Sequence, residues 1–532
     1  MFRRRFVALL QWVERHQTIL TASVGSAIVA IWTVLRHITN GINFDVVGQI
    51  GVAQQWVHGS QGGALFGATN YLIKMPLYML VNAVHAVPPV TRLLVLALLC
   101  SVGAYLLIYL LLRKIVRLYG VQDFSMLNLG MLWLATIAGR VFWVDYANSR
   151  NLEVAGGLAV LYLVLYIVER GASWRLVSTL VAASAVVFFA DPLQLYIVGV
   201  GMGIACAVHA VLHKGDIRRR ALLVGGGLVA GAVLSRVLLW VSTSLLPVSY
   251  LAPPKTTIAL SVSAVTTLIQ NTLTSTLRIF DINVFSKALS VNSLRQIGGM
   301  ALLFAAVYVL IRYRSSAPKR PARLVCWLIV WNYAVYVVSG NAQTAITERY
   351  LIMVPLLVVL LLGLYGGVMR PPQFRRFAQS WTMIVAMSAA LLFGAVIMQW
   401  PHRYKLDQPM FAVATFAQSH HYDFVIASRA LAVPGNYYAG YDKTLVPVVC
   451  VDNSHIAASN LFYDQAGYAG VLGRTKGTVA VVLPAQGITS APFHCSSASI
   501  LNQLGTPSST VDVPNIGTVY EFSASSLTLR SL

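Results

Sequence analysis

The sequence predicts an α-helical polytopic membrane protein with a small α/β domain at its C-terminal end. Long apolar segments predict the membrane part, since 57% of the 532 residues are hydrophobic and only 11% are charged. Basic residues gathered in alternate loops predict how these segments are oriented. After Pro401 the apolar runs shorten and alternate with turn residues, which predicts the separate domain.

A helix needs roughly 20 apolar residues to cross the hydrocarbon layer, which is about 30 Å thick. About eleven segments of a membrane module, residues 1–400, meet this need. The predicted spans are residues 17–38, 91–112, 122–140, 152–169, 175–195, 196–212, 221–246, 296–312, 323–339, 350–367 and 381–400.

The net charge of +22 does not predict nucleic-acid binding, because most basic residues lie in short loops beside apolar spans. In such loops Lys and Arg fix orientation and contact the head groups of the lipid bilayer. The N-terminus, MFRRR, has no small-residue cleavage site before the first span, so we expect a retained helix that starts in the cytoplasm. The loops then assigned to the cytoplasm carry Arg113, Lys114, Arg117, Arg170, Arg175, Lys214, Arg218, Arg219, Arg220, Arg312, Arg314, Lys319, Arg320, Arg323, Arg370, Arg375 and Arg376.

An odd number of spans places the C-terminal domain, residues 401–532, outside the cytoplasm of a multi-pass inner (plasma) membrane protein, in the periplasm. Residues 71–90 are apolar, but a crossing there would move every later basic loop outside. We therefore expect an interfacial helix at 71–90, inside a first extracytoplasmic loop that spans residues 39–91.

The C-terminal domain contains four segments typical of strands, separated by turn signals. Cys450 and Cys495 are its two cysteines, in a compartment that permits a disulfide, and the sequence leaves open whether they are bridged. The other three cysteines lie inside apolar spans. The expected strands are DFVIAS, TLVPVVCVDN, GTVAVVLPA and GTVYEF.

Acidic residues at the external ends of spans are candidates for function, because a charge near hydrocarbon is costly to keep. The alternative is that each pairs with Arg140, Arg150 or Arg349 to hold helix ends together. Asp45 stands apart, since it follows the first span with no basic residue nearby in sequence, as suits a general base. The other acids of this kind are Asp145, Glu153, Asp191, Asp281 and Glu348.

Several short motifs follow Asp45 in an order that resembles the GT-C superfamily of integral-membrane glycosyltransferases. Val46 after Asp45 departs from the Asp-Glu pair of the protein O-mannosyltransferase branch, and no Trp-Trp-Asp motif of oligosaccharyltransferases is present. The matching elements are Lys74-Met75-Pro76-Leu77, Arg92-Leu93, Asn148 to Glu153 (NSRNLE), and Thr347 to Leu351 (TERYL) followed by Pro355.

The resemblance implies inverting transfer of a monosaccharide from a polyprenyl-phosphate sugar to a cell-envelope glycan, lipid or protein on the extracytoplasmic face. Asp45 would be the catalytic base. Arg349 and Arg150 would bind the donor phosphate, with Lys74 and Arg278 as further candidates, because guanidinium groups bind phosphate oxygens in pairs. Residues that would orient these groups or bind sugar and acceptor are Glu153, Glu348, Asp145, His58, Tyr437 and Tyr438.

No His/Cys/Asp cluster in the sequence has the spacing of metal ligands, so no metal-binding residue is assigned. A divalent cation, Mg²⁺ or Mn²⁺, is still compatible with Asp45 and a donor phosphate, because the superfamily includes both metal-using and metal-free members. Two other functions stay open. One is a transporter or flippase for lipid-linked glycans, and the other is an O-antigen-type glycan ligase or polymerase. The sequence leaves the sugar, the linkage and the acceptor open.

Overall fold

The computed structural model divides the chain into two compact units, which are described separately here. One unit contains residues 1–33, 97–240 and 253–398, and the other contains residues 34–96, 241–252 and 399–532. The structure describes residues 16–34, 64–66, 69–84, 86–87, 89–136, 147–245, 248–250, 262–280, 282, 319–338, 351–366, 408–420, 422–428, 431–432, 435–436, 445–451, 455–458, 477–484, 495–514 and 516–523, and isolated positions from 300 to 311.

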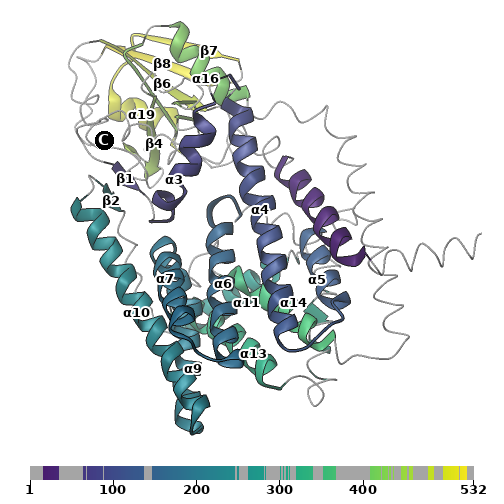
Figure 1. Ribbon diagram of the computed structural model, residues 1–532. Coiled ribbons are helices and arrows are strands. Elements are labelled where there is room, and N and C mark those ends of the chain that lie inside the picture. Colours follow the sequence, from purple (N-terminus) through teal and green to yellow (C-terminus); the bar gives the residue numbers. More distant parts are fainter. Residues whose placement is uncertain are drawn as a thin grey trace, which may run out of the picture. The chain divides into compact units, whose positions relative to one another are not determined.

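Within the described residues, 6 helices are long and apolar enough to cross a membrane, and three further apolar helices are shorter (Figure 1). Each coincides with a predicted span. The predicted span 296–312 shows only isolated helical positions, and 381–400 lies outside the described residues. The helices are His16–Val34, α4 (Pro89–Leu118), α5 (Ser125–Thr136), α6 (Ala147–Arg170), α7 (Trp174–Ala190), Pro192–Leu212 (α8, η2 and α9), α10 (Asp216–Leu245), α13 (Lys319–Val338) and α14 (Met353–Gly366).

Helix α14 forms the centre of the first unit (residues 1–33, 97–240 and 253–398), which is called the membrane unit from here on. Every residue from Leu351 to Tyr365 is buried, and the helix packs against α5 and α13. Glycines allow the close approach: a Cβ added at Gly130 of α5 would lie 3.0 Å from a methyl group of Val359, and one added at Gly363 would lie 3.0 Å from a methyl group of Val116. Small residues of this kind let membrane helices approach closely and gain dispersion contacts. These contacts matter because no hydrophobic driving force brings helices together in lipid.

Buried hydrogen bonds tie the first helix to its neighbours. The Tyr109 hydroxyl of α4 donates to Asn128 Oδ1 at 2.7 Å, and Asn128 Nδ2 donates to Gln17 Oε1 at 3.2 Å. One turn away, the Tyr105 hydroxyl donates to the carbonyl oxygen of Thr21 at 3.0 Å. Such bonds hold membrane helices together because a polar group in hydrocarbon has few other partners.

The chain turns back between α7 and α8 at Asp191, four residues before the boundary expected at 195/196. Asp191 has φ −138° and ψ 100°, which ends α7, and its side chain accepts a hydrogen bond from the Leu193 N–H at 3.1 Å. Pro192 then occupies the first turn of α8 (Pro192–Gln194), where its missing N–H costs nothing. The apolar sequence on both sides conceals this break, which a single Asp-Pro pair produces.

Two segments far apart in the sequence pair within the second unit. Strand β1 (Ala64–Phe66) is parallel to β2 (Val248–Tyr250), so the first external loop joins the loop at 247–295, which lies between the predicted spans 221–246 and 296–312 and which their alternation places on the same side. Helix α3 (Thr69–Asn82) follows β1 and includes most of the apolar segment for which an interfacial helix was expected. The β1–β2 pair and α11 (Val262–Ile279), which lies in the first unit, were not predicted from the sequence.

The C-terminal part of the second unit forms a six-stranded sheet of order β5-β4-β3-β6-β8-β7 (Figure 1). All four segments predicted as strands are strands. β3 is parallel to both β4 and β6, whereas β5, β8 and β7 are antiparallel to their neighbours. The strands are β3 (Phe424–Ser428), β4 (Leu445–Val451), β5 (His455–Ala458), β6 (Thr478–Pro484), β7 (Ser509–Val513) and β8 (Gly517–Ser523).

Each face of this sheet has its own apolar core, because side chains alternate along a strand. Val425 and Ala427 of β3 pack on one face with residues of α16 (Gln408–Ser419). Phe424 and Ile426 pack on the other face with Ile500 of α19 (Ser497–Leu504). β3 is buried along its whole length, as expected of a parallel strand covered on both sides.

Two glycines of α10 give a matched test of helix packing. A Cβ added at Gly231 would lie 1.9 Å from Ser184 Oγ and 3.2 Å from the carbonyl oxygen of Val181 on α7, whereas one added at Gly226 meets nothing within 4 Å. Gly231→Ala should therefore lower the thermal unfolding midpoint of the purified protein. Gly226→Ala should leave it unchanged or raise it, since Ala is the better helix former. Equal midpoints for the two variants would contradict this packing of α7 on α10.

Candidate active site

Most residues expected to carry chemistry lie outside the described part of the chain. Arg150 is in the first turn of α6, where only its backbone is described. Lys74, Glu153 and Arg278 have described side chains. The expected site residues outside the described ones are Asp45, His58, Asp145, Glu348, Arg349, Tyr437 and Tyr438.

Lys74 is the single charged residue of α3 and is buried, with 5% of its surface exposed. Tyr78 lies one turn further on the same face and is 2% exposed, whereas Leu80 on the opposite face is 68% exposed. A lysine is seldom buried to this degree unless it has a partner. The helix therefore turns its cation and its phenol inward and an apolar side chain outward.

Glu153 lies at the start of α6 and is 5% exposed. Asp191, at the start of α8, is 4% exposed. Sequence reasoning had included Asp191 only among the external acids, and it missed Gln194, which is fully buried at the end of α8.

Arg278 lies in the last turn of α11 and is exposed. A cation at this end of a helix is stabilised by the helix dipole. α11 is held against α13 by a hydrogen bond between the Ser275 and Tyr336 hydroxyls, which are 2.9 Å apart. Arg278 thus extends from a helix fixed to the membrane unit, inside the loop at 247–295.

In the C-terminal sheet, β3 occupies the point where the strand order reverses. The chain passes from β3 to β4 on one side and later to β6 on the other. Open α/β sheets bind ligands at the carboxyl ends of the strands beside such a point. Ser428 ends β3 there, is 4% exposed, and its hydroxyl has no hydrogen-bond partner among the described residues.

Asn436 belongs to the turn before Tyr437 and Tyr438. It lies at the amino end of β4, opposite to the carboxyl ends at which Ser428 lies. Its Nδ2 donates to the carbonyl oxygen of Leu445 at 2.7 Å, and its Oδ1 accepts from the Leu445 N–H at 2.8 Å. Leu445 begins β4, so Asn436 is fixed at the amino end of that strand. Both backbone groups of the strand's first residue are thereby paired.

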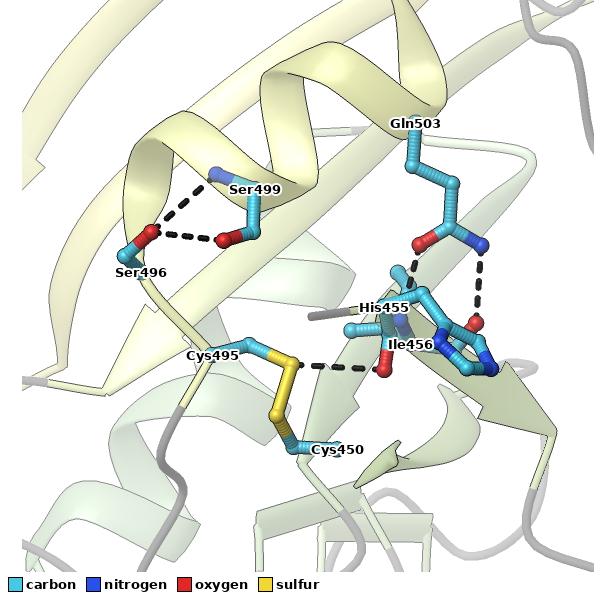
Figure 2. The surroundings of a disulfide bond; sticks show 7 residues. All are labelled: Cys450, His455, Ile456, Cys495, Ser496, Ser499 and Gln503. Atoms are coloured by element: carbon cyan, nitrogen blue, oxygen red, sulfur yellow. Dashed lines mark hydrogen bonds between the residues drawn. A yellow bond between two sulfur atoms is a disulfide. The ribbon is translucent and has the colours of Figure 1, made fainter. Parts of the chain in front are cut away.

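Cys450 and Cys495 form a disulfide, with Cα atoms 5.5 Å apart. The bridge joins β4 to the residue before Ser496, the N-cap of α19 (Figure 2). Gln503 of α19 pairs with both backbone groups of Ile456 on β5: the Ile456 N–H donates to Oε1 at 2.7 Å, and Nε2 donates to the carbonyl oxygen at 2.8 Å (Figure 2). α19 is therefore fixed to the edge of the sheet at both of its ends.

Glu521 of β8 accepts hydrogen bonds from the hydroxyls of Ser509 and Tyr422. These bonds, with a smaller contribution from His420, hold the pKa of the Glu521 carboxyl below its usual value. Because its folded pKa is lowered, the carboxylate stabilises the fold above the ordinary Glu pKa and loses this effect as the pH falls. Burial and the bond to Glu521 raise the pKa of Tyr422, so the phenol remains a donor at neutral pH. The cluster joins β7 and β8 to the start of β3.

No group of three or more His, Cys, Asp or Glu residues with the geometry of a metal site occurs in the described part of the chain. The described candidates instead offer a buried ammonium, two buried carboxyl groups and a buried carboxamide. Ammonium groups bind phosphate, and carboxyl and amide groups bind hydroxyls.

Comparison with known proteins finds no matching family model and no matching curated protein. A search of solved structures finds similarity to the crystal structure of ArnT from Cupriavidus metallidurans in the apo state. The TM-score is 0.45 and the sequence identity 12%, with 98% of this chain and 99% of that chain covered.

Removing the disulfide tests what holds the sheet together. Cys450→Ser with Cys495→Ser should destabilise the sheet by about 2–4 kcal/mol, because the bridge closes a loop in the unfolded chain. Thermal unfolding of the wild type with and without reductant should reproduce the difference. Cys326→Ser is the matched control, since Cys326 is a free cysteine of the membrane unit. An unchanged unfolding midpoint in the double variant would contradict a stabilising bridge.

Proposed function

We propose that this protein is an inverting membrane glycosyltransferase of the GT-C type, which moves a monosaccharide from a polyprenyl-phosphate sugar to an acceptor hydroxyl on the extracytoplasmic face. The observation that carries the proposal is the buried Lys74 on α3, in the Lys-Met-Pro-Leu element of the loop that begins with Asp45. An ammonium group in this loop can bind the phosphate of a lipid-linked donor.

In the proposed reaction the acceptor oxygen attacks the anomeric carbon as the bond from that carbon to the phosphate oxygen breaks. Asp45 takes the acceptor proton, and the polyprenyl phosphate leaves with the bonding electron pair. Attack from the side opposite the phosphate inverts the anomeric configuration. Lys74, Arg349, Arg150 and Arg278 would offset the negative charge that builds on the phosphate, the kind of electrostatic stabilisation that often contributes most to catalysis.

The segments that would form this site all belong to parts of the chain expected outside. The second compact unit consists of residues 34–96, 241–252 and 399–532, which include the expected first external loop at 39–91, the start of the loop at 247–295 and the expected external domain at 401–532. The β1–β2 ladder joins two of these segments directly. This grouping supports a common side for Asp45, Lys74 and the sheet.

The sheet is proposed to select the acceptor. The carboxyl ends of its strands beside Ser428 have the topology of a ligand site. Tyr437 and Tyr438, which follow Asn436 in the sequence, remain separate candidates for stacking on a sugar ring. The proposed acceptor is a glycan, a lipid or a protein of the cell envelope. A transporter of lipid-linked glycans would instead move its substrate without breaking a glycosidic bond.

Asp45→Asn tests the base. The amide cannot accept the proton, so sugar transfer from a panel of polyprenyl-phosphate sugars should fall by about 10²-fold or more, while folding and membrane insertion are retained. Transfer is measured as release of the sugar from its lipid carrier by the purified protein. Full turnover by the variant would remove Asp45 from the mechanism. Absence of turnover by the wild type with any donor would favour the transporter.

Arg349→Ala tests the phosphate contact. Loss of this guanidinium should weaken donor binding and slow transfer, since a paired contact to phosphate oxygens disappears. Arg314→Ala is the matched control, because Arg314 is expected in a cytoplasmic loop and should change neither quantity. Donor binding and initial rates are measured for both variants. If both substitutions have equal effects, general electrostatics at the membrane surface would account for Arg349.

A further inference from the structure

Gln194 is a polar side chain enclosed in the membrane unit. It is the last residue of α8 and has no exposed surface. Within the described part of the chain, neither its Oε1 nor its Nε2 has a hydrogen-bond partner. An enclosed carboxamide without partners opposes folding, so its presence calls for an explanation other than packing.

A glycine of α6, Gly157, makes room for this side chain, and the neighbouring Gly156 makes room for α7. A Cβ added at Gly157 would lie 2.3 Å from Gln194 Oε1, and one added at Gly156 would lie 2.8 Å from a methyl group of Val187 on α7. The carboxamide therefore lies against the bare backbone of α6. Any larger residue at 157 would displace it, so the space is shaped around a polar group.

Two buried carboxyl groups lie toward the same end of these helices. α6 packs against α7 and is joined to it by a short turn, and α7 turns back at Asp191, so α6 and the helix that begins at Pro192 run in the same direction (Figure 1). Glu153 precedes Gly157 by one turn, and Asp191 precedes Gln194 by three residues. Both acids therefore lie about one turn from the Gly157–Gln194 contact, toward the end expected outside.

The backbone beyond Gln194 is a wide turn. Leu195–Val200 form the π-helix η2, a conformation that is rare and often found at functional sites. Indoles of α13 pair with one carbonyl group inside η2 and one just after it: Trp331 Nε1 donates to the carbonyl oxygen of Tyr196 at 2.8 Å, and Trp327 Nε1 donates to that of Gly201 at 2.9 Å. The wide turn is thus fixed by a neighbouring helix, and it determines where Gln194 lies.

We propose that Gln194, with Glu153 and Asp191, forms a subsite for the hydroxyl groups of the donor's sugar. A carboxamide both donates and accepts hydrogen bonds, and carboxylates accept them, which matches hydroxyls that do both. The three described side chains include no cation, so the subsite suits an uncharged polyol and not the donor's phosphate. This inference rests on the proposed function and adds the residues that distinguish one sugar from another.

The test compares kcat/KM of the full-length protein for polyprenyl-phosphate sugars that differ at one hydroxyl. Gln194→Leu removes both the N–H donors and the carbonyl acceptor of the carboxamide. The ratio of kcat/KM between two such lipid-linked sugars should therefore fall by about tenfold or more. Gln194→Glu keeps the size of the side chain and its oxygen acceptor but loses the N–H donors, and should change which lipid-linked sugar is preferred. The Gln194→Glu variant also tests the subsite if the Gln194→Leu variant fails to fold. Asn332→Leu is the matched control, since Asn332 is a buried amide of α13 that donates to the carbonyl oxygen of Leu328 within its own helix.

Donor ratios in the two Gln194 variants equal to those of the wild type, with transfer retained, would overturn the subsite and leave the proposed function intact. Thermal stabilisation by the same lipid-linked sugars provides a second readout. Stabilisation that is lost in Gln194→Leu, without turnover by the wild type, would support the subsite and overturn the transferase. Neither stabilisation nor turnover with any donor would overturn both.

Discussion

The pairing of backbone polar groups in hydrocarbon is the constraint on which the rest of this structure depends. No water is present there to bond a free N–H or carbonyl group, so each crossing must be a helix that pairs its own backbone. Where a helix departs from this rule, another group must supply the partner. The Asp191 carboxylate does so for the Leu193 N–H, and the Trp331 and Trp327 indoles bond to carbonyl groups within η2 and just after it.

The same constraint decides where chemistry can occur. Charged and polar groups are retained at helix ends and in the loops, and the buried members described here, Lys74, Glu153, Asp191 and Gln194, lie in segments assigned to the external face or to helix ends that meet it. The donor of the proposed reaction would bring its phosphate and sugar to this level of the membrane. The proposed division of labour follows: cations for the phosphate, buried oxygen and amide groups for the sugar, and Asp45 for the acceptor proton.

Much of the fold was predictable because the signals are long or periodic. Runs of apolar residues identified the described membrane helices, and short apolar runs between turn residues, such as TVAVVLP, identified strands of the sheet. β1 and β2 escaped prediction because three-residue strands have no detectable period and their partners are about 180 residues apart. α11 escaped because its Ser and Thr residues resemble a loop. The break at Asp191 escaped because the apolar pattern continues on both sides of it.

The candidate site was predictable to a different degree. The sequence suggested Glu153 because an acid at the end of an apolar span is costly to keep, and it suggested Lys74 through its Lys-Met-Pro-Leu element; both roles stay predictions. Gln194 carries no charge and lies in an apolar run, so only its burial and its contact with Gly157 single it out. A sequence shows which residues are costly to bury, and only packing shows which neutral ones are enclosed.

The central claim is that the first loop, the loop at 247–295 and the C-terminal sheet share the extracytoplasmic face. Single cysteines at Gln61, Thr256 and Ser525 test it most directly, in a protein whose free cysteines are replaced, with Ser315 and Gln373 as cytoplasmic controls. A membrane-impermeant thiol reagent on intact cells should label the first three positions, and should label the two controls only after permeabilisation. Protection of any of the first three, or labelling of a control in intact cells, would contradict the account.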